Sequence, residues 1–521
     1  MPELIHDLVV VSDLHIGRGK NPESGRYYEL EAFFYDDDFR RFCEWLVSDS
    51  LASGRDFKLI LNGDTFDLLR LDAVPLPEDL GNNNEASEVR RRVKPDRSGF
   101  APVLTPSRAA AELARILEGH PRFCIALAKV LAAGHDIMVL PGNHDIEIQW
   151  EPVQQAVRDA LVASKELGEG DAAERALAHL HFLPWFHHEP KRVWIEHGCQ
   201  YDPENAFRYP LRRELVSLPD AVHEAELDNP LGNFFQRYLY NAFGHITFIV
   251  PSTRANARYL KWLSVNNPGL LLRIVRSHWR FWWQVVKRVL KYPSRARTRI
   301  AENHARELAE LAKSSGLGDT LLAIDKLKDT RTDLVQAIRG FGWQALKATF
   351  ALLLVGTLVL GTWFAGYHAI NQVTLGFVGK AALFLMFSFG FLVMLFGALA
   401  YTLLRGGAAV PPEPMRRAAA EIARMVDVPV VSFGHSHDEV LWRNMGPGER
   451  DSWYFNTGTW IAVFTHDVLL PRERVQFTFL RVRDATGELL HWSPGRGEPL
   501  PVILLDEGRP HRDVARPEVP A

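Results

Sequence analysis

The sequence predicts an α/β fold in which helices cover a sheet whose strands end in polar, chemically active residues. Five apolar runs have this form, and they lie at residues 8–11, 59–61, 137–140, 193–195 and 428–433. Helical stretches at residues 37–50 and 109–133 lie between them. Strands that alternate with helices favour an α/β sheet, and such sheets bind ligands outside their strand ends.

The composition indicates a chain that folds around a large core. Of its 521 residues, 47% are hydrophobic, and the formal net charge is only −3. These values exclude a mostly disordered chain and a polyelectrolyte tail. The length fits roughly three domains of ~150 residues, or one elaborated domain with large insertions. The 3 cysteines show neither disulfide nor metal-site spacing, which favours a reducing compartment.

Three further segments are interpreted from their local composition. The apolar run at residues 8–11 is too short for a signal peptide and lacks a basic leader, so we expect a buried strand and a catalytic part that is not exported. Residues 76–106 are rich in Asn, Pro and Arg and predict a long loop or cap. The tail from residue 506 shows no periodicity and is expected to fray.

Two long uncharged segments, residues 348–367 and 381–404, are each long enough to cross a bilayer as a helix. Their outer flanks carry several Lys and Arg residues, whereas the connector holds only Lys380. Basic flanks favour the cytosolic side. We therefore expect a transmembrane hairpin in the cytoplasmic (inner) membrane, with the catalytic domain facing the cytosol. The alternative is a pair of deeply buried core helices.

Every one of the five apolar runs is followed by residues that can bind a metal ion. These residues are Asp13, His15, Asp64, Asn143, His197, His435 and His437. Oxygen and imidazole donors together suit Mn, Fe or Zn, and seven donors are enough for two divalent ions. A carboxylate that bridges the two ions would let them hold a hydroxide and polarise a phosphoryl oxygen. Asp64 is the natural bridge.

The order of these blocks resembles the calcineurin-like metallophosphoesterase superfamily. The matching blocks are Asp13-Leu14-His15, Gly63-Asp64, Gly142-Asn143-His144-Asp145, His197-Gly198 and Gly434-His435-Ser436-His437. The resemblance covers residues 1–205 and 425 to about 480, where residues 454–459 resemble the strand that commonly follows the last block. It implies a four-layer αββα metallophosphoesterase sandwich and hydrolysis of a phosphoester or pyrophosphate bond by a metal-bound hydroxide.

The resemblance also implies individual roles. Asp13, His15 and His437 would hold one ion and Asn143, His197 and His435 the second, with Asp64 between them.

His144 would face the substrate and protonate the leaving oxygen, a task that suits an imidazole. Asp67 would support His144, although Leu68-Leu69 replaces the Arg-Gly that follows in the superfamily's phosphoprotein phosphatases. Asp145 either caps the following helix or belongs to the site, and residues 201–205 either form a turn or reach the mouth of the site.

The region between the two halves of the motif set is basic. Residues 251–300 contain 12 Lys or Arg and no Asp or Glu. Apolar residues spaced three and four apart predict an amphipathic helix there, and its Trp279, Trp282 and Trp283 suit an anionic membrane surface. The alternative is a helix packed on the catalytic domain with a solvated basic face. Nucleic acid is not an expected partner, because no nucleic-acid module accompanies the charge.

We therefore expect one catalytic domain in two parts, separated by a large helical insert that carries the transmembrane hairpin. The expected boundaries are residues 1–205 for the N-terminal part, 206–345 for the basic insert, 346–405 for the hairpin, 425–505 for the C-terminal part and 506–521 for the tail.

The expected activity is that of a membrane-anchored, two-metal phosphoesterase. A branch of the superfamily near UDP-2,3-diacylglucosamine pyrophosphatase is similar around Asp13 and Asp64, but that enzyme typically carries Arg where this chain has His144. A lipid-linked phosphorylated substrate and contact with membrane lipids are therefore one expectation. The alternatives are a soluble nucleotide phosphatase, a protein phosphatase and a non-catalytic membrane scaffold. The sequence makes no prediction about oligomeric state.

Overall fold

The structure is a computed structural model with a mixed α/β fold and two main sheets. It describes residues 6–71, 104–211, 294–328, 361–405, 413–444, 451–465 and 475–502, apart from 22, 23 and 29, together with short pieces at 213, 229–230, 232–233, 236–237, 241, 248–249, 269 and 468–469. The α/β class expected from the sequence is confirmed. Most of the predicted cap at 76–106, the basic stretch within 251–300 up to residue 293 (residue 269 excepted), and the tail from 506 lie outside these residues.

The first sheet contains four parallel strands followed by three antiparallel ones. Its strands are β1 (Asp7–Val11), β2 (Phe57–Asn62), β3 (Asp136–Leu140), β4 (Leu180–Phe182), β13 (Phe477–Arg483), β14 (Thr486–Ser493) and β15 (Glu498–Pro501). Their order is β15-β14-β13-β1-β2-β3-β4, with β1 to β4 parallel. Because β1 pairs with both β2 and β13, the two ends of the chain complete one sheet.

The second sheet joins segments from both sides of the insert. Its strands are β5 (Phe186–Glu189), β6 (Val193–Glu196), β8 (Val430–Phe433), β9 (Glu439–Asn444) and β10 (Ser452–Thr457), in the order β5-β6-β8-β10-β9. β6, β8 and β10 are parallel, and Val193 pairs with Val430. A small third sheet contains β7 (Phe248–Ile249), β11 (Val463–Thr465) and β12 (Val468–Leu469). The insert therefore leaves the second sheet after β6 and returns to it at β8.

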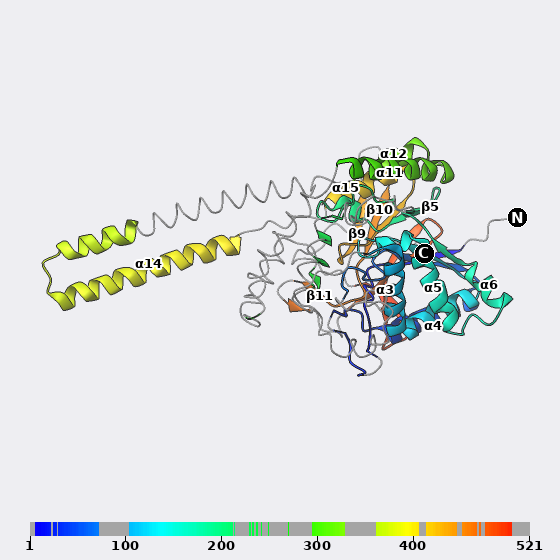
Figure 1. The fold of residues 1–521 in the computed structure, drawn as a ribbon, viewed down its shortest axis with the longest axis horizontal. Helices are drawn as coiled ribbons and strands as arrows, with labels where there is room; N and C mark the ends of the chain where they lie inside the picture. Colours follow the sequence, from blue (N-terminus) through cyan, green and yellow to red (C-terminus); the bar gives the residue numbers. More distant parts are fainter. Residues whose placement is uncertain are drawn as a thin grey trace, which may run out of the picture.

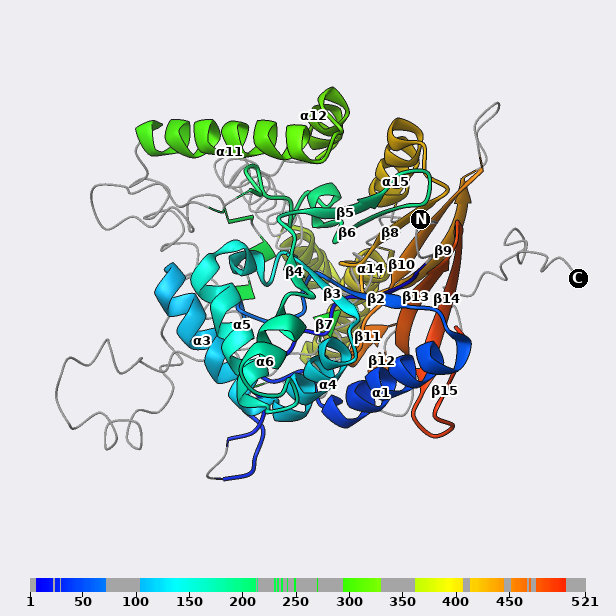
Figure 2. The same cartoon turned by 90° about the vertical axis from the view of Figure 1, so that its right-hand side faces the viewer.

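Buried apolar side chains divide the molecule into layers. One core lies between the two sheets and includes Val10, Ile60, Ile195 and Val430. The first sheet packs on α1 (Asp36–Ser53), α3 (Pro106–Gly119), α4 (Pro121–Ala132), α5 (Glu151–Ala163) and α6 (Asp171–Leu177). The second sheet packs on α11 (Ser294–Ser314), α12 (Asp319–Asp325) and α15 (Glu413–Val426). Figure 2 shows these two helix groups on opposite sides of the sheets.

The helix predicted over residues 109–133 is wrong in one respect, because the structure has two helices there. α3 ends at Gly119 and α4 begins at Pro121. A proline disfavours helical backbone at the residue before it, and His120 has φ −128° and ψ 54°. The break brings the His120 side chain into the interior, where it is completely buried.

The insert contributes one described part that packs on the body and one that extends from it. Leu308 of α11 and Leu321 and Ile324 of α12 belong to the core beside the second sheet. α14 (Phe377–Arg405) lies away from the sheets (Figure 1). Residues 361–372 are helical and contact it through Trp363, whose ring centroid is 5.2 Å from that of Phe384.

α14 covers the second predicted membrane segment, 381–404, although its side chains are described only as far as residue 391. Residues 348–360 of the first predicted segment lie outside the description. Within the described part of the chain, no helix combines the length and apolar character that crossing a membrane requires.

A buried ion cluster braces the loop that follows β1. The Glu31 carboxylate accepts backbone N–H groups from Gly17 and Phe33 at 3.2 and 2.7 Å. His120 Nε2 lies 3.2 Å from Glu31 Oε2, and His120 Nδ1 lies 3.0 Å from Asp36 Oδ1. Burial lowers the pKa of His120, but the hydrogen bonds and charges of Asp36 and Glu31 outweigh it and raise the pKa to about 9. The charged imidazole therefore ties the β1 loop to the α3–α4 junction.

This cluster should make stability fall in mildly alkaline solution. A histidine whose pKa rises from 6.5 to about 9 on folding stabilises the protein fully below 6.5, and this contribution is lost as the pH rises through 9. The free energy of unfolding should fall over this range by on the order of 3 kcal/mol more in the wild type than in His120→Gln. Urea unfolding at several pH values measures the difference, and parallel curves for the two proteins would contradict the assignment.

Candidate metal centre

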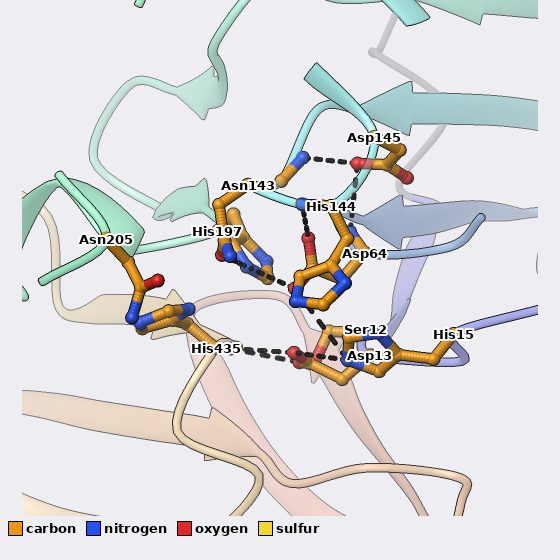
Figure 3. Close-up of polar contacts among 12 residues, drawn as sticks. Ser12, Asp13, His15, Asp64, Asn143, His144, Asp145, His197, Asn205 and His435 are labelled. Carbon is orange, nitrogen blue, oxygen red and sulfur yellow. Dashed lines mark hydrogen bonds and ion pairs between the residues drawn. The ribbon is translucent and has the colours of Figure 1, made fainter. Parts of the chain in front are cut away.

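The residues predicted to bind metal come from five strand ends in the two sheets. Asp13 and His15 follow β1, Asp64 follows β2 and Asn143 follows β3 in the first sheet. In the second sheet, His197 follows β6, and His435 and His437 follow β8. Parallel strands present their carboxyl ends at the same edge of a sheet. The side chains of both sheets therefore converge on one place (Figure 3).

The first donor group consists of Asp13, His15, Asp64 and His437, all of them buried. His15 Nε2 lies 2.9 Å from His437 Nε2 and 3.7 Å from Asp64 Oδ2. His437 Nε2 is 3.3 Å from Asp13 Oδ1. One donor atom from each of the four residues lies within 4.8 Å of the others, which is close enough for a shared ion.

The second donor group consists of Asp64, His197 and His435 and shares its carboxylate with the first. His197 Nε2 lies 3.3 Å from Asp64 Oδ2 and 3.3 Å from Asn143 Oδ1. His197 Nδ1 donates to the backbone oxygen of Asn62 at 3.0 Å, which leaves Nε2 directed toward the donors. A ring nitrogen fixed in this way by a backbone carbonyl is common in metal-binding histidines.

Backbone strain is concentrated at these residues. Among the residues that the structure describes, 9 non-glycine residues have positive φ. Five of them are predicted metal ligands, namely Asp13 at 54°, His15 at 46°, Asp64 at 50°, His435 at 68° and His437 at 55°. Such a conformation costs about 1–3 kcal/mol per residue and clusters at functional sites. The surrounding structure therefore holds these loops in an unfavourable backbone conformation that places the five side chains at the centre.

Two glycines of the motifs are required by close approach between different blocks. A Cβ atom added to Gly142 would lie 2.1 Å from Asp64 Oδ1. One added to Gly434 would lie 2.5 Å from Asp13 Oδ2. Each glycine thus leaves room for a predicted ligand that comes from another strand end.

The buried charged groups of the centre shift one another's pKa values. Burial raises the pKa of Asp13 and Asp64, but nearby imidazoles, His197 foremost, outweigh it and lower both values. Burial lowers the pKa of His197, whereas Asp64 and Asp13 raise it to about 10. Burial, followed by the charge of His144, lowers the pKa of His15 to about 4, which favours the neutral imidazole that binds metals. Positive charge therefore stabilises the ionised carboxylates of Asp13 and Asp64, and a bound metal cation would add such charge.

His144 and Asp67 form a hydrogen-bonded pair next to the first donor group. His144 Nδ1 lies 2.9 Å from Asp67 Oδ1, and its ring centroid is 4.6 Å from that of His15. Burial lowers the pKa of His144, but Asp67 and Asp64 outweigh it and raise the value. The backbone N–H of His144 also donates to Asp64 Oδ1 at 2.7 Å. The structure therefore brings both predicted catalytic residues to the edge of the donor groups.

Asp145 acts differently from a helix cap. It makes no side-chain hydrogen bond at the start of η2 (Ile146–Gln149). Its carboxylate instead accepts backbone N–H groups from Asp64, Thr65 and Phe66 at 2.8 to 3.2 Å and from Gly142 at 2.6 Å. Asp145 thus joins the loops after β2 and β3, and the capping alternative is wrong.

Two further residues contact predicted ligands, and only one of them lies in a segment that the sequence had singled out. Asp202 Oδ2 lies 3.0 Å from His435 Nε2, within the segment 201–205 that was expected to form a turn or reach the site. Asn233, from the insert, exchanges hydrogen bonds with Asn143. Asp202 could be found from the sequence because it lies close to the His197 block. Asn233 belongs to no motif, so no sequence signal pointed to it.

The arrangement could hold metal ions. Carboxylate and imidazole donors are buried and converge from strand ends, with the buried Asn143 amide beside them. Two groups of these donors share Asp64, and His15, Asp67 and His144 form a third group that could hold an ion. Such a mixed oxygen and nitrogen set is typical of transition-metal sites. Comparison with protein-family models and with curated proteins finds no match for this chain. The assignment of these residues therefore rests on their own geometry and chemistry.

Metal ions should stabilise the folded chain through Asp64. A ligand that binds only the folded state adds about 2.7 kcal/mol at a concentration of 100 times its Kd. Mn²⁺ or Zn²⁺ should therefore raise the melting temperature of metal-stripped protein. Asp64→Asn removes an anionic oxygen from both donor groups and should abolish most of this rise. Asp37→Asn, whose side chain on α1 is 47% exposed, is the matched control and should respond like the wild type.

Proposed function

We propose that this chain is a metal-dependent phosphoesterase that hydrolyses a phosphoester or pyrophosphate bond. The observation that carries the proposal is a pair of buried donor groups that share Asp64 and adjoin the His144–Asp67 pair. The order of these residues along the chain, which resembles that in calcineurin-like metallophosphoesterases, also supports the proposal. Asp13, His15, Asp64 and His437 would hold one ion, and Asp64, Asn143, His197 and His435 the other.

The reaction would combine metal chemistry with proton transfer from the protein. When bound, two divalent ions supply Lewis acidity toward a phosphoryl oxygen and make a water more acidic. His144 Nδ1 is bonded to Asp67, so Nε2 is the atom that would protonate the leaving oxygen. Asp67 holds the ring and favours its charged form, since it raises the pKa of His144 against the effect of burial.

A protein-phosphatase activity has less support than hydrolysis of a smaller or lipid-linked substrate. The Arg-Gly that follows the supporting Asp in phosphoprotein phosphatases is replaced by Leu68-Leu69, and both leucines are buried. Neither side chain can bind a phosphate. We therefore favour other phosphoesters and pyrophosphates over phosphoproteins.

We also propose that the chain is anchored to the cytoplasmic membrane, with its metal centre on the cytosolic side. Uncharged segments with basic flanks favour this location. The described part of α14 adds support, because Phe377, Leu385, Met386 and Phe389 are 87, 68, 72 and 72% exposed. A large exposed apolar surface of this kind indicates a lipid or protein contact. A lipid-linked phosphate or diphosphate is accordingly the substrate class that we put forward.

Variants at the centre should separate metal binding from proton transfer. His144→Ala should keep the metal content of the wild type but lower kcat by about 10²- to 10⁴-fold, because it removes the general acid. Asp64→Asn should lose both metal and activity. Metal analysis measures the first effect, and an assay with an alkyl phosphate, whose leaving oxygen must be protonated, measures the second. An unchanged kcat in His144→Ala would refute the role of this histidine, and a wild type without metal-dependent release would indicate a non-catalytic scaffold.

A substrate panel tests the proposed class. Detergent-solubilised lipid phosphates and lipid-linked diphosphates are compared with soluble mononucleotides, cyclic nucleotides and a phosphopeptide. We expect the highest kcat/KM for a lipid-linked compound. A clear preference for soluble nucleotides would overturn the lipid assignment and leave the metal-dependent hydrolysis intact.

A further inference from the structure

A short segment of the insert reaches the metal centre. Gly232 and Asn233 are separated in sequence from every motif of the centre, yet the Asn233 side chain is only 2% exposed and lies against Asn143. Asn143 is itself 2% exposed. The insert therefore places one of its side chains in a buried position beside a predicted ligand.

Two hydrogen bonds link the asparagines and select one orientation of the Asn143 amide. Asn143 Nδ2 donates to Asn233 Oδ1 at 3.3 Å, and Asn233 Nδ2 donates to the backbone oxygen of Asn143 at 2.8 Å. With its nitrogen held by Asn233, Asn143 directs Oδ1 toward His197, whose Nε2 lies 3.3 Å away. A metal ion binds an amide side chain through its oxygen, because the NH₂ group is only a hydrogen-bond donor and has no lone pair free to bind a metal. Asn233 thus holds Asn143 in the orientation that can bind a metal.

The segment is fixed in place by the turn that also contacts His435. The backbone N–H of Gly232 donates to the backbone oxygen of Glu204 at 2.8 Å. A Cβ atom on Gly232 would lie 2.1 Å from Asn205 Oδ1, so a larger residue would displace the segment or the turn. Asn205 Nδ2 donates to Asp202 Oδ2 at 2.7 Å, and the same oxygen lies 3.0 Å from His435 Nε2. Figure 3 shows Asn205 beside His435, across the centre from His144.

We propose that Asn233 is a positioning residue that the insert supplies to the metal centre, where it orients Asn143 for the ion held with His197 and His435. This inference rests on the proposed function, because it assumes that both donor groups bind ions. It assigns the insert a role in building the second half of the centre. The ion held by Asp13, His15 and His437 does not depend on this contact.

The test is a metal titration of the full-length, detergent-solubilised chain. Metal-stripped wild type, Asn233→Ala, Asn233→Asp and Gln236→Ala are titrated with Zn²⁺ in competition with a chromophoric chelator, which yields the affinity for each ion. Gln236→Ala is the matched control, because it removes a similar amide contact within the insert, the 3.1 Å bond from Gln236 Nε2 to Asn241 Oδ1. Asn233→Asp keeps the acceptor for Asn143 Nδ2 and nearly the same volume.

Loss of an outer hydrogen bond to a metal ligand typically weakens metal affinity by about 10- to 100-fold. We expect Asn233→Ala to lower the affinity for one of the two ions by this factor and to leave the affinity for the other unchanged. Gln236→Ala should bind both ions like the wild type. Asn233→Asp should lose less than about tenfold, because it keeps the acceptor for Asn143 Nδ2. If the alanine variant does not fold, a loss of about tenfold or more in Asn233→Asp would contradict the inference.

Other outcomes would overturn the inference. Wild-type affinity for both ions in Asn233→Ala would show that the contact positions nothing. A structural role only would be indicated if Asn233→Ala lost affinity equally for both ions and one of two further results held. Either Gln236→Ala would show the same loss of affinity, or Asn233→Asp would lose as much affinity as Asn233→Ala. The proposed function fails separately, through a wild type that binds ions but releases no phosphate from any substrate. A wild type that binds no ion would overturn both.

Discussion

The structure depends on the burial of carboxylates and imidazoles at one point where the parallel strands of two sheets end. Asp13 and Asp64 are almost completely buried, and desolvation of two such anions is costly unless positive charge or hydrogen bonds compensate it. His197 provides part of that charge within the described residues. The strand ends fix the positions of the donor residues, while the apolar side chains of the same strands pack in the core. A divalent cation at this point would turn an electrostatic cost into a stabilising interaction.

The surrounding parts of the centre serve this same requirement. Asp145 accepts several backbone N–H groups from the loops after β2 and β3. Thr459 donates its hydroxyl to the backbone oxygen of Asp13 at 2.6 Å, and Asn62 accepts from His197. Left-handed backbone at five donor positions is tolerated because these bonds hold the loops from several sides. Rigidity at the donors thus comes from neighbouring strands and not from any single loop.

The insert affects the centre through topology as well as through Asn233. β6 and β8 are adjacent in the second sheet, although Val193 and Val430 are far apart in sequence. The segment between them must return to the same sheet before His435 and His437 can join the donors. Helices α11 and α12 of the insert pack on the outer face of that sheet together with α15.

The sequence by itself determined the α/β class, the approximate position of the five strands that lead into the centre and the candidate donor residues that follow them. Apolar runs that end in Asp, Asn or His are local patterns, so Asp13, Asp64, Asn143 and His197 could be found from the residues around them. The break at Pro121 was equally local and was nonetheless missed. The tertiary structure alone decided that Asp145 joins two loops, that Asp202 meets His435 and that Asn233 meets Asn143. These contacts join segments from different parts of the chain, and such contacts depend on strand register and on the packing of both sheets. Neither the strand register nor the packing of the two sheets can be obtained from a pattern along the sequence.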